Sequence, residues 1–209
     1  VRRRHAVQTV RLRAAAMQEA VPAGAGEMAA VLGLSAIDVI AVCAESTKAS
    51  GEIAEAVNFN DPGQTVIAGS KLGVEKASEL LKARGAKRCL PLPVSAPFHS
   101  SLMKPAAEKL REKLASLSFS APQIPVINNI DVAVQTDAAK IKDALYRQAF
   151  GPVRWVECVQ AIKARGISHI MECGPGKVLA GMTKRIDAEL TAGAVFDPAS
   201  LAEAKALIA

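Results

Sequence analysis

Residues 53–68 read Ile-Ala-Glu-Ala-Val-Asn-Phe-Asn-Asp-Pro-Gly-Gln-Thr-Val-Ile-Ala. Two short runs of the kind that forms strands flank the turn signal Asn60–Gly63. The second run follows the first closely enough for a β-hairpin, so we expect paired strands over 53–59 and 64–68. This hairpin is the centre from which the rest of the fold can be predicted.

The segments on either side of the hairpin extend it to a β-α-β-β-α-β pattern. Ser35, with Asp38 three positions further on, predicts the start of a helix before the hairpin, and Gly85 predicts the end of a helix after it. The other expected ranges are strand 28–34, helix 74–83 and strand 88–94. This order is that of a ferredoxin-like unit, and we predict such a subdomain over residues 24–96.

Helices alternate with strands in the rest of the chain. The helices are expected at 6–20, 101–117, 137–149, 154–165 and 177–190, and the strands at 126–130, 169–173 and 194–196. Such alternation predicts a mostly parallel sheet covered by helices. The predicted fold class is therefore α/β, with a large core formed by residues 1–23 and 97–209 and the subdomain inserted into it.

Composition limits the class of function. Half of the 209 residues are hydrophobic and 22% are charged, which predicts a sizeable core, and the net charge of +6 favours an anionic partner. Aromatic residues make up 3%, so nucleic-acid binding by base stacking is disfavoured. The sequence has no apolar run long enough to cross a membrane. The four cysteines form no Cys-x-x-Cys pair and no cluster with histidine, which indicates reduced thiols and no metal site.

Two positions are candidates for chemistry on their residue type and place. His99 lies in Pro97-Phe-His-Ser100, between an expected strand and an expected helix, where a histidine can transfer protons. A packed or capping histidine is equally compatible with this spacing. Arg13 shares a helix face with Met17 and could hold an anion there, although an ordinary surface arginine is the commoner explanation. Gly174-Pro-Gly-Lys177 lacks the spacing of a phosphate loop and predicts a tight strand-to-helix turn.

Several segments resemble one known family and keep its order along the chain. They are Met17–Pro22, Val57–Asn60, Pro62–Gln64, Val66–Gly69, Leu90–Ser95, His99 with Leu102–Pro105, Pro125–Asn129 and Gly174–Leu179. Together they are similar to segments of the malonyl-CoA:acyl carrier protein transacylases of fatty acid synthesis. The resemblance implies an α/β hydrolase-like core with an inserted ferredoxin-like subdomain, and it implies no metal or other cofactor.

The resemblance also implies a reaction. Family members transfer malonyl from malonyl-CoA to the phosphopantetheine thiol of an acyl carrier protein through a serine ester. The family's Gly-His-Ser-Leu-Gly motif, which carries that serine, is absent from this sequence. We therefore expect the chain to be the later part of a longer protein and to be inactive alone.

The family's roles can be assigned to matching positions. His99 corresponds to the catalytic histidine, Gln148 to the glutamine whose carbonyl oxygen orients it, and Arg13 to the arginine that holds the malonyl carboxylate. Positions expected to line the site are Met17, Asn60 and Phe98. A bulky residue immediately before the histidine is compatible with malonyl rather than methylmalonyl selection.

Two other functions remain compatible with the sequence. The chain could be an acyltransferase domain of a polyketide synthase, or a non-catalytic module that docks an acidic carrier protein. For the transacylase we expect a cytoplasmic monomer whose partners are malonyl-CoA and an acidic acyl carrier protein, steered by the positive charge.

Overall fold

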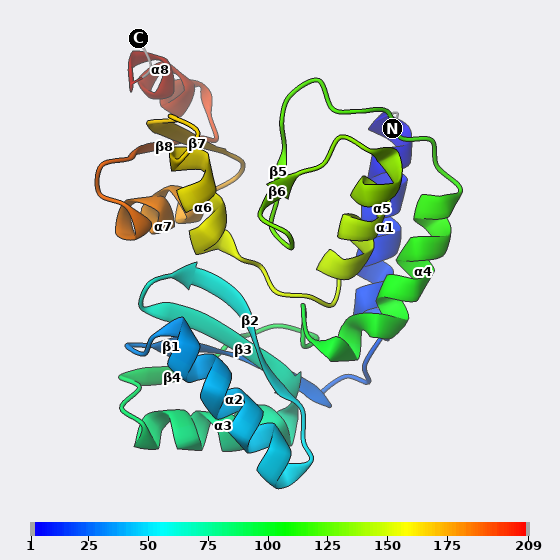
Figure 1. The fold of residues 1–209 in the computed structure, drawn as a ribbon, viewed down its shortest axis with the longest axis vertical. Coiled ribbons are helices and arrows are strands. Elements are labelled where there is room, and N and C mark those ends of the chain that lie inside the picture. Colours follow the sequence, from blue (N-terminus) through cyan, green and yellow to red (C-terminus); the bar gives the residue numbers. More distant parts are fainter. Residues whose placement is uncertain (1–2, 208–209) are drawn as a thin grey trace.

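The computed structural model describes residues 3–207, so four residues of the predicted core, 1, 2, 208 and 209, lie outside the described residues. The fold belongs to the α/β class, as predicted (Figure 1). The helices are α1 (Arg3–Glu19), α2 (Ala36–Ser50), α3 (Lys71–Ala83), α4 (Lys104–Ala115), α5 (Ala138–Gln148), α6 (Trp155–Lys163), α7 (Val178–Ile186) and α8 (Pro198–Leu207), with a 3-10 turn η1 (Ser101–Met103) before α4. The strands are β1 (Gly26–Leu32), β2 (Ala54–Asp61), β3 (Gln64–Ser70), β4 (Arg88–Pro91), β5 (Ile127–Asn128), β6 (Ala133–Val134), β7 (His169–Cys173) and β8 (Thr191–Val195).

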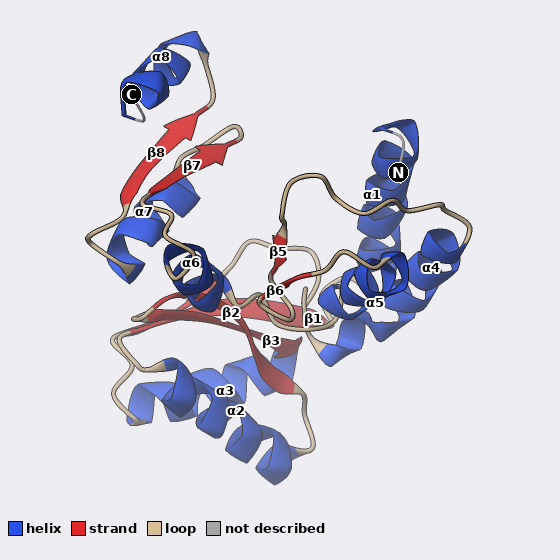
Figure 2. Ribbon diagram, turned by 45° about the horizontal axis from the view of Figure 1, so that its top comes forward, coloured by secondary structure: helices blue, strands red, loops and turns tan. Residues whose placement is uncertain are grey.

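The predicted hairpin is β2 and β3, and it belongs to a four-stranded antiparallel sheet of order β2-β3-β1-β4. The predicted β-α-β-β-α-β order over this segment is confirmed. Ser35 caps α2 as expected, with its Oγ accepting from the backbone N–H of Asp38 at 3.2 Å. Helices α2 and α3 both cover one face of the sheet (Figure 2).

Side chains alternate between the two faces of the four-stranded sheet, and each face packs in its own apolar cluster. Ala29 and Val31 of β1 face α2 and α3, where they pack with Val39 and Leu81 in the larger core cluster. Met28, on the opposite face of the same strand, packs instead with residues of β2 and β3 and with Phe98. The second face of the sheet is thereby joined to the rest of the molecule, on the side where His99 follows Phe98.

The mostly parallel sheet that we predicted is not found among residues 3–207. The only named strands that pair in parallel there are β7 and β8, and the expected strand 126–130 is the two-residue β5, paired antiparallel with β6. The reason is physical: hydrophobic periodicity indicates that a segment is extended, but it does not indicate which strand it pairs with or in which direction. A short hairpin is therefore found where we predicted a strand over 126–130.

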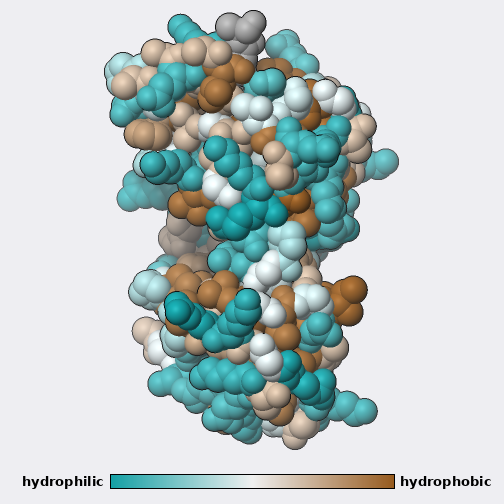
Figure 3. All heavy atoms as spheres, turned by 90° about the vertical axis from the view of Figure 1, so that its left-hand side faces the viewer, coloured by the Kyte–Doolittle hydropathy of each residue, from teal (hydrophilic) through white to brown (hydrophobic). Residues whose placement is uncertain are grey.

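Two further groups of elements lie beside the four-stranded sheet. Helices α1, α4 and α5 lie side by side (Figure 1). Buried residues such as Met17 of α1, Met103 of η1 and Ala106 of α4 form a shared core there. Strands β7 and β8 form the second group with α6, α7 and α8. Seen from the side, the molecule narrows at mid-height between the sheet unit below and the other elements above (Figure 3). Among residues 3–207, no helix is long and apolar enough to cross a membrane.

Candidate functional site

The His99 side chain stands on a short, strongly held turn between β4 and η1. His99 has a positive φ of 65°, a conformation that costs energy for a residue other than glycine. The buried Ser100 fixes the turn by donating from Oγ to the carbonyl of Pro97 at 2.6 Å. The backbone N–H of Ser101 donates to Oε2 of Glu55 on β2 at 2.7 Å. The sheet unit therefore helps to hold the histidine in a strained position.

His99 reaches the end of α5. Its Nδ1 lies 3.1 Å from the backbone carbonyl oxygen of Gln148. Because a carbonyl only accepts hydrogen bonds, Nδ1 carries the proton in neutral His99 and Nε2 is the free acceptor. Burial lowers the pKa of His99 and the charge of Arg13 acts in the same direction, whereas the carbonyls of Gln148 and Gly151 oppose the shift. The imidazole is thus held neutral, with Nε2 ready to accept a proton.

Arg13 joins the same glutamine from the other side. Its Nη2 donates to the side-chain Oε1 of Gln148 at 3.0 Å. Burial lowers the pKa of this guanidinium, but arginine stays charged at any ordinary pH. Gln148 therefore uses its backbone carbonyl for the histidine and its side-chain carbonyl for the arginine. The structure brings together three predicted site residues from α1, α5 and the turn before η1.

Arg13 and His99 line one cavity of about 510 Å³, and two further predicted residues, Met17 and Phe98, lie in its wall. The cavity is lined by Arg13, Ala14, Met17, Gln18, Met28, Asn58, Leu92, Val94, Phe98 and His99. Met17 is buried and Phe98 is half-buried against both neighbouring apolar clusters. The cavity therefore offers one cation, one neutral imidazole and apolar walls, a combination that suits a short organic anion.

Asn60 is not among the residues that line this cavity. Its Nδ2 donates to Oε1 of Gln64 at 3.0 Å, across the hairpin, and Asn58 lies in the cavity wall instead. Our prediction for Asn60 depended on the family resemblance, and the pairing of β2 with β3 is irregular next to it, between Ala56 and Asn58 and again between Phe59 and Asp61. The sequence carried no signal for this irregularity.

The Gly174–Lys177 turn and the possible metal ligands were also considered in the sequence. The Gly174–Lys177 turn leads from β7 to α7 as expected, and Oε2 of Glu172 accepts the backbone N–H of Ala180 in the first turn of α7 at 2.9 Å. A carboxylate thus takes the place that an anion would need, which is a second reason against a phosphate loop. Within residues 3–207, no group of three or more His, Cys, Asp or Glu side chains could hold a metal ion.

Sequence comparison finds close relatives of one kind. No protein-family model matches the chain. The malonyl CoA-acyl carrier protein transacylase of Salmonella typhimurium is 54% identical over 199 residues, which are 95% of this chain and 64% of that protein. The Escherichia coli enzyme of the same name is 51% identical over the same shares. The chain is homologous to the malonyl CoA-acyl carrier protein transacylases.

Solved transacylase structures share the fold. The acyl-carrier-protein S-malonyltransferase of Burkholderia pseudomallei matches with a TM-score of 0.92 and 65% identity, over 95% of this chain and 64% of that one. A malonyl-transacylase solved in complex with a type II polyketide synthase acyl carrier protein matches with a TM-score of 0.92 and 50% identity, over the same shares. The chain thus spans 64% of the length of these transacylases.

Proposed function

We propose that this chain supplies the proton-transfer and carboxylate-binding residues of a malonyl-CoA:acyl carrier protein transacylase. The observation that carries the proposal is the double role of Gln148, which holds His99 and Arg13 at one cavity. A transferase for an acyl group that ends in a carboxylate needs a base and a cation at a fixed separation. Gln148 sets this separation, because it bonds both His99 and Arg13.

In the proposed reaction His99 moves one proton in each half. Nε2 takes the proton of the serine hydroxyl while the serine oxygen bonds to the malonyl thioester carbon, and the imidazolium returns the proton to the departing coenzyme A thiolate. In the second half Nε2 takes the proton of the phosphopantetheine thiol, whose sulfur bonds to the acyl carbon, and returns it to the serine oxygen. The Gln148 carbonyl fixes the tautomer, although it stabilises imidazolium less than a carboxylate would.

Arg13 is the proposed partner of the malonyl carboxylate. Among residues 3–207 the structure gives its guanidinium one hydrogen bond, to Gln148, and no carboxylate partner. The remaining N–H groups of the planar fork suit a bidentate carboxylate contact, which a lysine could not reproduce. Phe98 beside the cavity would restrict a branched acyl group, in agreement with malonyl selection. Met17 would add an apolar wall, whereas a place for Asn60 at the site remains a prediction.

The domain division is part of the same proposal. We infer a ferredoxin-like subdomain over residues 24–96, inserted into an α/β hydrolase-like core that includes residues 1–23 and 97–209. The sheet order β2-β3-β1-β4, with both helices on one face, supports the subdomain. The acidic carrier protein would approach a chain of net charge +6, which would steer the encounter.

The test joins this chain to the serine-bearing segment of the Salmonella relative, in the place that the segment has there. The joined protein should transfer malonyl from malonyl-CoA to holo acyl carrier protein, whereas the 209-residue chain alone should not. His99→Ala in the joined protein should lower the transfer rate by at least about 10²-fold, the lower range for a general base. Transfer at near wild-type rates after this substitution would show that the proposed mechanism is wrong.

Carrier-protein binding separates the enzyme from a docking module. A docking module needs neither His99 nor Arg13, so it would bind carrier protein equally well in both alanine variants and would transfer nothing in the joined protein. An enzyme loses turnover in these variants even where carrier-protein binding persists. Fluorescence anisotropy of labelled carrier protein, measured beside the transfer assay, distinguishes these two functions.

A further inference from the structure

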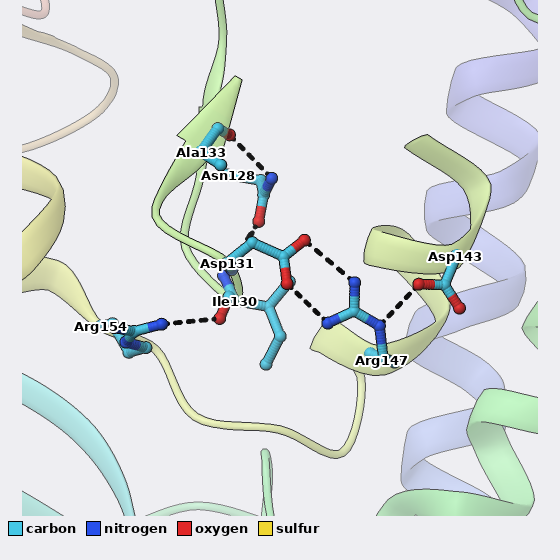
Figure 4. Close-up of polar contacts among 7 residues, drawn as sticks. All are labelled: Asn128, Ile130, Asp131, Ala133, Asp143, Arg147 and Arg154. Carbon is cyan, nitrogen blue, oxygen red and sulfur yellow. Dashed lines mark hydrogen bonds and ion pairs between the residues drawn. The ribbon is translucent and has the colours of Figure 1, made fainter. Parts of the chain in front are cut away.

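Gln148 is the last residue of α5, so the place of its carbonyl depends on what holds that helix end. The side chain of its neighbour Arg147 points toward the β5–β6 turn (Figure 4). Nη1 and Nη2 of Arg147 donate to the two carboxylate oxygens of Asp131 at 2.7 and 2.9 Å. Nε donates to Asp143 one turn earlier, at 2.7 Å. A bidentate fork thus joins the end of α5 to a turn whose residues do not line the cavity.

The turn that carries Asp131 is rigid in its own right. Oδ1 of Asn128 accepts the backbone N–H groups of Ile130 and Asp131, at 3.2 and 2.8 Å, and Nδ2 of Asn128 donates to the carbonyl of Ala133 at 2.8 Å. Val132 has a φ of 56°, which a β-branched residue adopts only when its surroundings enforce it. Asp131 is therefore presented by a turn with little freedom.

The same turn also holds the segment that follows α5. The backbone N–H of Arg154 donates to the carbonyl of Asn129 at 3.1 Å, and its Nη1 donates to the carbonyl of Ile130 at 3.3 Å. The side chain of Ile130 lies so close to Gly151 that a Cβ there would be 2.5 Å from its Cδ1. The turn thus contacts the chain on both sides of Gln148, before it through Arg147 and after it through Gly151 and Arg154.

We propose that Asp131 and Arg147 form a positioning pair that sets the Gln148 carbonyl against His99 and thereby selects the Nδ1–H tautomer of the histidine. Neither residue touches the cavity, so neither is a catalytic residue. The pair acts through the backbone: the fork fixes the last turn of α5, and the carbonyl of Gln148 at the end of that turn accepts the hydrogen bond from Nδ1–H of His99. The side chains of Asp131 and Arg147 are 24% and 36% exposed, less than the 58% of Asp143.

The chain offers a matched control for this pair. Asp143 contacts the same guanidinium but lies on α5 itself and is 58% exposed, so its loss leaves the connection to the turn intact. Asp131→Asn and Asp143→Asn each remove one negative charge that contacts the guanidinium of Arg147. Only Asp131→Asn weakens the contact between α5 and the turn. A difference between the two variants therefore shows an effect of that contact and not of the lost charge next to Arg147.

The test measures the tautomer of His99 by two-dimensional ¹H–¹⁵N NMR of the histidine rings in the 209-residue chain. His5→Gln and His169→Gln assign the signals. We expect the Nδ1–H form to dominate in the parent chain and in Asp143→Asn. In Asp131→Asn the tautomer ratio should fall about fivefold, the factor that corresponds to one neutral hydrogen bond of about 1 kcal/mol. An unchanged ratio in Asp131→Asn would overturn the proposal.

Kinetics in the joined protein give a second readout, and this one rests on the proposed function. Asp131→Asn should lower kcat about tenfold, since a small misplacement of the base is costly, while the KM for malonyl-CoA changes less than about twofold. Arg147→Lys, which keeps the charge and loses the fork, should behave like Asp131→Asn. If the joined parent protein transfers no malonyl, the proposed function fails while the tautomer measurement still decides the pair. If transfer is normal and Asp131→Asn matches Asp143→Asn in both readouts, the pair has no positioning role.

Discussion

The backbone carbonyl of Gln148 lies 3.1 Å from Nδ1 of His99, although the two residues are 49 positions apart in the chain. A backbone carbonyl is a durable acceptor, because no substitution of the side chain removes it. The side-chain carbonyl of Gln148 is then free to accept from Arg13. One residue at a helix end therefore fixes both the tautomer of the base and the place of the cation, which explains how a neutral residue can organise this site.

The burial of His99 predicts how stability depends on pH. Burial lowers its pKa in the folded chain below the ordinary value of 6.5, so the unfolded chain binds more protons between these two values. The stability that neutral His99 contributes is therefore complete above about pH 6.5 and is lost as the pH falls through the folded pKa. The free energy of unfolding from urea titrations should decline over this window by at most about 1.4 kcal/mol per pH unit.

His99→Gln should remove this component of the pH dependence. His169→Gln is the control, because His169 is exposed at the start of β7. If the parent chain and His99→Gln lose stability in parallel between pH 7 and pH 5, the decline has another source and the neutral state of His99 is not maintained by the fold.

Arg13→Lys tests the carboxylate contact in the joined protein. Lysine keeps the charge and loses the planar fork, so it should raise the KM for malonyl-CoA about tenfold or more. Transfer of acetyl from acetyl-CoA, whose acyl group carries no free carboxylate, should not become slower. Steady-state rates with both donors measure the difference. Equal effects on malonyl and acetyl transfer would contradict a carboxylate-binding role for Arg13.

Glu55 should stabilise the turn that presents His99. Its Oε2 accepts the backbone N–H of Ser101 at 2.7 Å, and alanine in its place would leave that N–H without its partner. Glu55→Ala should lower the free energy of unfolding by about 1–2 kcal/mol, while Glu55→Gln keeps an acceptor and should lose less. Chemical denaturation measures both, with the exposed Glu79→Ala on α3 as control. A loss no greater in Glu55→Ala than in the control would mean that the contact does not hold the turn.

Local signals in the sequence predicted most of the elements. The hairpin, the Ser35 cap and the strand over 169–173 were read from residue type and spacing, and the structure contains each of them. The predicted cluster of Arg13 and His99 depended on the resemblance, since periodicity alone favoured a surface arginine. Their meeting at Gln148 requires α1, α5 and the turn before η1 to pack together, which spacing along the chain does not encode.

What the sequence did not reveal depends on contacts between distant segments. The contact of Asp131 with Arg147 joins a turn to a helix end, and Asp131 could as well have been an ordinary turn residue. Asn60 was expected at the site from the resemblance, but its side chain donates to Gln64 across the hairpin and does not line the cavity. The predicted mostly parallel sheet is not found among residues 3–207, because a strand pattern does not specify the partner of each strand.

Glycine at position 69 is required by packing, and this gives a test of the sheet unit. A Cβ on Gly69 would lie 1.8 Å from the carbonyl oxygen of Ile53, a backbone atom that cannot move aside without disturbing β2. Gly69→Ala should therefore lower the free energy of unfolding by about 3 kcal/mol or more. Gly174→Ala is the matched control, since nothing lies within 4 Å of its added Cβ. The control should be neutral or slightly stabilising, because alanine reduces the freedom of the unfolded chain. Urea denaturation of both variants decides the point, and equal stability would mean that β2 and β3 do not approach each other as closely as the structure shows.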